Sequence, residues 1–193
     1  EEDIAALSGE ISEMEIEYDD KMTQLAENDN DFFRIFEFYN SSIAKYGFYA
    51  GTKDVTGKGI EISIDDGNPT NGTVSNYLLV HDSTLLNIIN ALRDSGAQAI
   101  SINGERVVAD TEIICMGTGI KVNDKKIFAP FSIKAIGNSD ILYSDFVNSA
   151  VYKNIVTADL LVNVSVSDTV KIAGYTGFTE DNVKYLKDSE VTE

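Results

Sequence analysis

The stretch of residues 81–104 constrains the fold of this 193-residue chain more than any other part of its sequence. Asp82 or Ser83 can begin a helix there, because their side chains accept backbone N–H bonds in the first turn. The apolar face of this helix would consist of Leu85, Leu86, Ile88, Ile89 and Leu92. Gly96 supplies a left-handed end, and a strand over 99–102 leads directly into an Asn-Gly turn. We expect a right-handed strand–helix–strand crossover.

Strand patterns fill most of the region after Thr52. Alternating apolar and polar residues predict strands at 59–64 and 131–137, and a short apolar run predicts one at 77–80. Further strands are expected at 112–116, 119–122, 126–128, 160–166 and 170–173, with a tight turn at Asn123-Asp124 and a helix over about 141–152. The predicted fold class is α+β, a two-layer sandwich of a mixed β-sheet with two helices.

A heptad pattern occupies the start of the chain. Its apolar positions follow alternating three- and four-residue steps, as in a coiled-coil seam: Ile4, Leu7, Ile11, Met14, Tyr18 and Leu25. This helix either folds onto its own domain or forms an oligomerising stalk, and its narrow apolar stripe favours the stalk. A second, more aromatic helix is expected from about Asp29 to Tyr46, with Gly47 as its end.

These patterns predict three parts: a helical coiled-coil stalk (1–46), a globular α/β domain (52–178) and a polar tail (179–193) that frays.

The composition of the chain limits the functions that it can have. The formal net charge is −17, and the first 31 residues alone carry 12 acidic residues against one lysine. Such a chain is not suited to nucleic acid or to anionic membrane surfaces, because phosphate binding needs clustered Lys and Arg. The single cysteine excludes an internal disulfide.

Several blocks of the globular domain resemble the YlxW/YlxX-like family, domain-of-unknown-function family 881. The blocks are residues 55–60, 80–82, 97–106, 114–115, 120–123 and 129–137, within a match over roughly 52–175. The resemblance implies a Gram-positive bacterial protein with one N-terminal membrane helix, a coiled-coil stalk and an extracytoplasmic α/β domain, often encoded near cell-division and envelope genes. The chain begins at Glu1 within a helical repeat, so we expect a piece that lacks the membrane helix. The resemblance brings no established reaction with it.

Few residues could carry chemistry. His81 and Asp82 either cap a helix or act in acid/base or metal chemistry, and a lone histidine makes a poor metal site. Cys115 is expected on a buried strand as a small hydrophobe, and as a nucleophile it would need His81, the only histidine, as its base. Arg106 either pins a loop or binds an anion.

We therefore expect a non-enzymatic, membrane-tethered extracytoplasmic interaction module with no cofactor, metal or catalytic residues. It would form a homo-oligomer through its N-terminal helices and bind an unidentified protein partner of envelope or division processes. One alternative is a small-molecule or peptide binding domain with a site near His81, Asn103 and Arg106. A less favoured alternative is a hydrolase built on His81 with Asp82 or Cys115, which requires these side chains to lie within hydrogen-bond reach.

Overall fold

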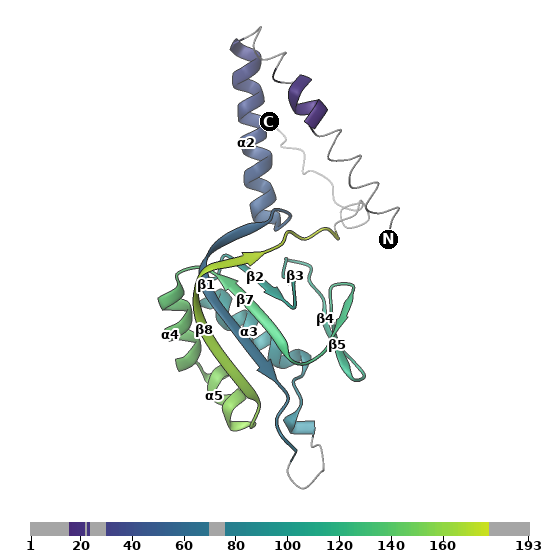
Figure 1. Ribbon diagram of the computed structural model, residues 1–193, viewed down its shortest axis with the longest axis vertical. Coiled ribbons are helices and arrows are strands. Elements are labelled where there is room, and N and C mark those ends of the chain that lie inside the picture. Colours follow the sequence, from purple (N-terminus) through teal and green to yellow (C-terminus); the bar gives the residue numbers. More distant parts are fainter. Residues whose placement is uncertain (1–15, 22, 24–29, 70–75, 178–193) are drawn as a thin grey trace, which may run out of the picture. The chain divides into compact units, whose positions relative to one another are not determined.

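A computed structural model describes residues 16–21, 23, 30–69 and 76–177 of the chain (Figure 1). The chain divides into two compact units, Glu1–Tyr49 and Ala50–Glu193. Most of the predicted heptad seam and the whole predicted polar tail lie outside the described residues. Within them, no helix has both the length and the apolar character that a bilayer-spanning segment needs.

The described part of the first unit is helical. Residues 16–21 and 23 are helical, and Lys21 pairs with Glu17 one turn away at 2.6 Å. Helix α2 (Asn30–Ala50) passes through Gly47, the predicted end, and stops before Gly51, whose φ is +79°. A glycine inside a helix costs only about 1 kcal/mol relative to alanine, so Gly47 does not end α2. Gly51 does, because it takes the left-handed conformation.

A five-stranded sheet forms the frame of the second unit (Figure 1). Its order is β3-β2-β7-β1-β8, with bounds β1 (Val55–Asp65), β2 (Ala99–Ile102), β3 (Glu105–Arg106), β7 (Phe131–Ile136) and β8 (Leu161–Ile172). Each hydrogen-bonded pair of these strands is antiparallel. The expected crossover therefore joins two parallel strands, β1 and β2, that are not neighbours, because β7 lies between them.

The prediction of a strand at 77–80 is wrong. Residues Asn76–Leu78 form a short 3-10 helix, η2, and β1 is the strand that precedes the crossover helix. Hydrogen bonds to the loop after β1 hold this segment: Asp66 Oδ1 accepts from the Val80 N–H at 2.7 Å, and the Gly67 N–H donates to the Leu78 carbonyl at 2.7 Å. Its backbone groups are therefore not free to join a sheet.

The main core lies between this sheet and three helices, which confirms the predicted two-layer α+β class. The sheet is antiparallel, however, and not mixed as the sequence predicted. The helices are α3 (Asp82–Asp94), α4 (Ser139–Asn148) and α5 (Ala150–Thr157). They bury Leu85, Ile88, Ile89, Leu92, Leu142, Phe146 and Ile155 against Ile60, Ile62 and Ile64 of β1. One helix was predicted where α4 and α5 lie. Ser149 divides them with an extended backbone, and its Oγ accepts from the Tyr152 N–H at 3.1 Å.

A second, smaller core lies where β1 begins and β8 ends. The pairing register of β1 with β8 shifts between Gly57 and Gly59. Beyond that shift, Val170 and Ile172 pack with Ala99 and Ile136, and Val55 lies against them. The two separate strands predicted at 160–166 and 170–173 are thus one continuous strand, β8, that pairs with β1 over its whole length.

A three-stranded sheet completes the second unit, in the order β4-β5-β6. Its strands are β4 (Ile113–Met116), β5 (Gly119–Val122) and β6 (Lys125–Ile127), as the sequence predicts. Asn123 takes a positive φ of 52° in the predicted turn. The sheet is tied to the start of α3, because Asp82 Oδ2 accepts a hydrogen bond of 2.9 Å from the Cys115 N–H.

The close approach of β1 and β7 gives a first prediction. A Cβ added at Gly59 would overlap the carbonyl oxygen of Ala135 on β7. We expect Gly59→Ala to lower the free energy of unfolding by about 1–3 kcal/mol, the usual cost of overpacking. Urea titration followed by circular dichroism measures this. Lys58→Ala, at an exposed neighbouring position, should change stability by less than about 0.5 kcal/mol, and equal effects of the two substitutions would contradict the packing described.

The bond between Asp82 and β4 gives a second prediction. The Cys115 N–H lowers the pKa of the Asp82 carboxyl below its ordinary value of 3.8, with a smaller contribution from the Ser83 N–H, while partial burial opposes the shift. A lowered pKa means that the carboxylate stabilises the fold above pH 4 or so and that this stability is lost as the pH falls further. Asp82→Asn should therefore flatten the acid limb of a stability-against-pH curve.

The control for this measurement is Asp168→Asn, which removes one carboxylate from an exposed position on β8. Both variants are unfolded in urea between pH 7 and pH 2.5 or thereabouts, a range that spans the ordinary carboxyl titration. If Asp82→Asn and Asp168→Asn follow the same pH dependence, the Asp82–Cys115 bond contributes nothing specific.

Candidate functional site

A cavity of about 190 Å³ lies at the start of α3. His81, which immediately precedes the helix, and Cys115 of β4 both line it. The remaining wall includes Asp66, Thr118, Ile120 and Phe131. His81 and Cys115 are 34 positions apart in sequence, and the packing of β4 against α3 brings them together.

Two hydrogen-bonding contacts orient the imidazole ring of His81. Its Nε2 lies 3.0 Å from the carbonyl oxygen of Asn76, and its Nδ1 lies 3.8 Å from the Sγ of Cys115. A carbonyl oxygen only accepts, so Nε2 carries the proton in this arrangement. In the neutral ring Nδ1 is then an acceptor that faces the thiol.

The carboxylate of Asp82 is bound to backbone N–H groups and not to the histidine ring. Oδ2 accepts from the Cys115 N–H at 2.9 Å and Oδ1 from the Ser83 N–H at 2.7 Å. The Asp82 N–H in turn donates to Cys115 Sγ at 3.3 Å. The proximity that the hydrolase hypothesis requires is therefore present for His81 and Cys115, whereas Asp82 positions the β4 backbone.

The expected burial of Cys115 is wrong. The thiol is exposed, and of the four residues of β4 only Ile113 is buried. The sequence pattern failed here because β4 belongs to a small sheet that shields only one of its apolar positions. Ile114 and Met116 are 44% and 49% exposed, so an apolar run did not indicate a core strand.

Arg106 is buried and holds the backbone of two other segments. Its Nη1 donates to the carbonyl oxygens of Lys53 at 3.2 Å and Ala173 at 3.5 Å. Burial lowers the pKa of the Arg106 guanidinium, and the negative charge of Asp54 opposes this shift. Of the two roles considered for Arg106, the geometry shows pinning of the chain, with carbonyl oxygens in place of a carboxylate.

Asn103 has a structural role in the turn between β2 and β3. Its φ is +48°, its Oδ1 accepts from the Ser132 N–H at 2.7 Å, and its own N–H donates to the Ser132 carbonyl at 2.8 Å. These two bonds join the turn to the start of β7. The side-chain oxygen and the backbone N–H of Asn103 are therefore both used within the fold.

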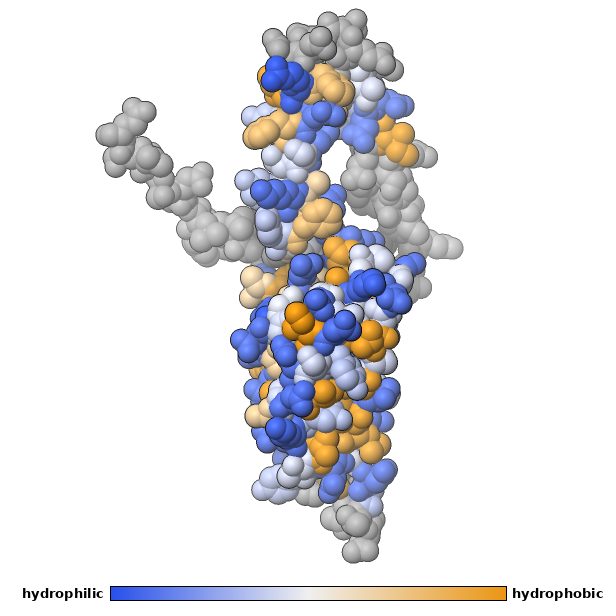
Figure 2. All heavy atoms as spheres, turned by 90° about the vertical axis from the view of Figure 1, so that its left-hand side faces the viewer, coloured by the Kyte–Doolittle hydropathy of each residue, from blue (hydrophilic) through white to orange (hydrophobic). Residues whose placement is uncertain are grey.

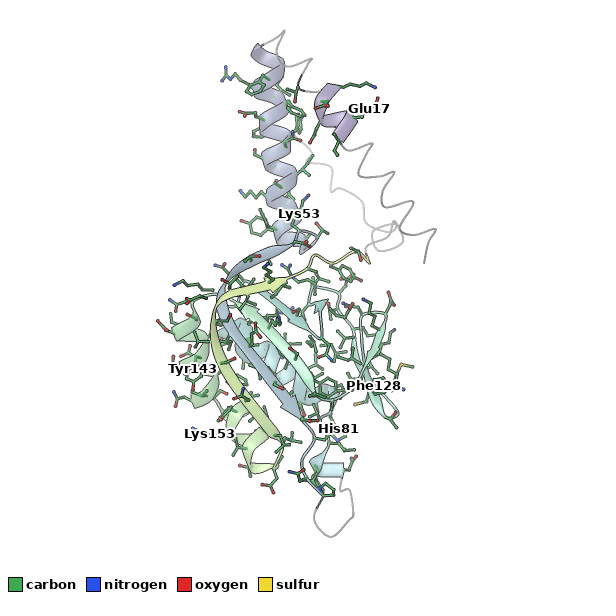
Figure 3. The ribbon with its side chains drawn as sticks, in the orientation of Figure 1. Glu17, Lys53, His81, Phe128, Tyr143 and Lys153 are labelled. Atoms are coloured by element: carbon green, nitrogen blue, oxygen red, sulfur yellow. The ribbon has the colours of Figure 1, made fainter. Side chains whose placement is uncertain are left out.

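The three residues predicted to share one ligand site do not converge. Figure 3 shows His81 and Lys53 near opposite ends of the five-stranded sheet, and the carbonyl oxygen of Lys53 accepts a hydrogen bond from Arg106. Arg106 pairs with Ser101, back along β2 from the turn, because β3 is antiparallel to β2. Its long side chain then reaches away from His81. A common site for His81, Asn103 and Arg106 is therefore not formed.

A second cavity, of about 340 Å³, lies beside Arg106 and Asn123. Asn123 is 7% exposed and its Nδ2 donates to the Arg106 carbonyl at 3.1 Å. Its Oδ1 is buried with no hydrogen-bond partner among the described residues, which costs about 1–3 kcal/mol. The sequence indicates Asn123 only as a turn residue. Burial of the Asn123 amide depends on packing against segments that are distant in the sequence, so the residues around Asn123 do not indicate it.

Metal ligation finds no support in the described part of the chain. No group of three or more His, Cys, Asp or Glu side chains there has the geometry to hold an ion.

Apolar side chains are exposed on the face that carries α4, α5 and β8. Figure 2 shows them between polar and charged groups on this side of the molecule. The exposed residues include Ile141, Tyr143, Val156, Leu161 and Val166. Because polar groups interrupt them, this face is weaker evidence for a contact surface than a continuous apolar patch would be.

Comparison with known proteins places these features in a family. The family described as "Bacterial protein of unknown function (DUF881)" matches residues 42–187. UPF0749 protein YlxW of Bacillus subtilis is 36% identical over 110 residues, which cover 55% of this chain and 47% of YlxW. UPF0749 protein Rv1823 of Mycobacterium tuberculosis is 30% identical over 148 residues, covering 72% of this chain and 48% of that protein.

A solved structure has a similar fold. The crystal structure of an uncharacterized conserved protein from Mycobacterium tuberculosis superposes with a TM-score of 0.61 at 25% sequence identity, over 77% of this chain and 99% of that one. The match to each of the two curated relatives spans just under half of that relative's length. The extent of the family match shows that the chain belongs to the DUF881 family of bacterial proteins, whose function is unknown.

Proposed function

We propose that this chain is an interaction module that self-associates through its N-terminal helices and presents its second unit to a protein partner. The observation that carries the proposal is the exposed aromatic surface of α2. The family resemblance supports the further proposal that the region is extracytoplasmic, tethered to the cell membrane by a single helix, and active in division or envelope processes.

The apolar surface of α2 is large for a single helix. Tyr39, Ile43 and Tyr46 are 61%, 62% and 68% exposed, and Phe33, Ile35, Phe38, Phe48 and Tyr49 are also exposed. Single exposed apolar residues are ordinary. A helix that exposes eight such side chains is not, and contiguous apolar patches on soluble proteins commonly mark contact surfaces.

The spacing on α2 favours a second copy of the same helix as the occupant. Phe36, Tyr39, Ile43, Tyr46 and Ala50 follow steps of three and four residues, the pattern with which helices pack side by side. The helix has 21 residues and is about 31 Å long, so the stripe extends over several turns.

Charge does not oppose this association. Helix α2 contains two acidic residues, Asp31 and Glu37, and two basic residues, Arg34 and Lys45. It therefore carries no net charge, in contrast to the strongly acidic start of the chain. Two copies of α2 can approach without the repulsion that would weaken pairing of the first segment at low salt.

A second candidate function, binding of a small molecule, is favoured by the cavity beside His81. The site would differ from the one expected from the sequence. The Oδ1 of Asn103 and the Nη1 of Arg106 are bonded within the fold, and Arg106 reaches away from His81. The site would therefore consist of His81 with Cys115 and the residues that line the cavity beside them.

Self-association can be tested with one charge placed on either side of α2. Ile43→Asp places a carboxylate in the proposed seam, whereas Ser41→Asp places it on the opposite side of the helix. Loss of a central apolar contact costs about 2 kcal/mol or more, so Ile43→Asp should raise the dissociation constant about 30-fold or more. Sedimentation equilibrium of the full chain at micromolar concentrations measures this.

Ser41→Asp serves as the matched control, since it adds the same charge at mid-helix and should leave association unchanged. A wild-type chain that is monomeric at tens of micromolar would overturn the self-association proposal. Equal weakening by the two substitutions would show a general charge effect, which is also incompatible with a defined seam.

A further inference from the structure

We infer that Cys115 is a nucleophilic thiol with His81 as its base, and that the adjoining cavity receives a small, uncharged acyl group. This inference goes beyond the proposed interaction role and does not depend on it. The cluster joins two side chains from separate elements, and each of them lines the same cavity.

The imidazole ring of His81 is held with one nitrogen facing the thiol. A working nucleophile–base pair lies within hydrogen-bond reach, and a third group holds the base. Here the Asn76 carbonyl accepts from His81 Nε2 at 3.0 Å, which leaves Nδ1 directed at Cys115 Sγ at 3.8 Å. The carbonyl thus has the orienting role that a side chain fills in other nucleophile–base–orienter groups.

A backbone donor faces the sulfur. The Asp82 N–H donates to Sγ at 3.3 Å, and Asp82 is the first residue of α3. Backbone N–H groups at the start of a helix stabilise negative charge, so this donor assists the sulfur as it acts as the nucleophile. The Asp82 carboxylate opposes a thiolate, but it stabilises the imidazolium that forms when His81 accepts the proton.

The size and lining of the cavity limit the groups that it can admit. Its volume of about 190 Å³ is below the roughly 300–1,000 Å³ of pockets for drug-sized ligands, so it suits a short group. Leu79, Ile120 and Phe131 give it apolar walls. The carboxylates that face it, Asp66 in the wall and Asp82 beside Cys115, disfavour an anionic ligand.

The reaction is an acyl transfer without any redox change. Sγ attacks the carbonyl carbon of an ester while the thiol proton passes to His81 Nδ1. The bond between that carbon and the leaving oxygen then breaks, and the oxygen keeps the electron pair and takes the proton from His81. The products are S-acylated Cys115 and an alcohol.

The test uses the full chain with 4-nitrophenyl acetate as the probe. We expect release of one equivalent of 4-nitrophenol per chain and an intact mass that increases by one acetyl group on Cys115. His81→Gln should slow the acylation by about 100-fold, since general base catalysis contributes about 10²–10⁴. Cys115→Ala should abolish it. Met116→Ala, a change at the next exposed position of β4, should react at the wild-type rate.

Equal acylation rates for the wild type and His81→Gln would overturn the inference, because the thiol would then react only through its exposure. Acetylation at lysines in place of Cys115 would overturn it as well. Unfolding curves of each variant show that the fold is retained. The Ile43→Asp variant is expected to react like the wild type, so a failure of self-association and a failure of thiol reactivity are separate results.

Discussion

The second unit depends on the pairing of β1 with strands on both of its edges. This 11-residue strand is bonded to β7 on one side and to β8 on the other, antiparallel in both cases. Its inward residues, Ile60, Ile62 and Ile64, are at most 1% exposed and form the floor on which α3, α4 and α5 pack. Gly59 permits the close approach of β1 to its neighbour β7 within the sheet.

Features that are encoded locally could be predicted from the sequence. Gly96 ends α3 with a φ of +86°, and Asn103 and Gly104 take the positive φ values that the Asn-Gly turn requires. Alternation of apolar and polar residues located β1 and β7. These signals depend on a few adjacent residues, so one sequence is sufficient to find them.

Features that depend on distant packing could not be predicted in this way. The run 77–80 has a strand-like composition, but its backbone is bonded to the loop after β1. Ser149 breaks a helix that local propensity would continue. The strand order that puts β7 between β1 and β2 has no short-range signal, since residues 131–136 follow the crossover by about 30 positions.

The candidate site illustrates the same limit. His81 and Cys115 were each recognisable as chemically interesting, but their separation of 3.8 Å arises from the docking of β4 on α3. The expected site failed for the opposite reason: Asn103 and Arg106 are close in sequence, yet their side chains serve different parts of the frame. The positions of Asn103 and Arg106 in the sequence indicated the turn between β2 and β3. They did not indicate the direction in which the Arg106 side chain points.

The adjacency of β1 and β8 also bears on how the second unit responds to force. Val55 pairs with Ile172, so the chain enters and leaves the unit at one end of the sheet. A force that pulls these two points apart acts across the hydrogen bonds between β1 and β8 and would break them one after another. Separation would begin where Arg106 donates to the carbonyl oxygens of Lys53 and Ala173. Arg106 therefore holds together the end of the sheet at which the two strands would begin to separate, next to the smaller core that contains Val170 and Ile172.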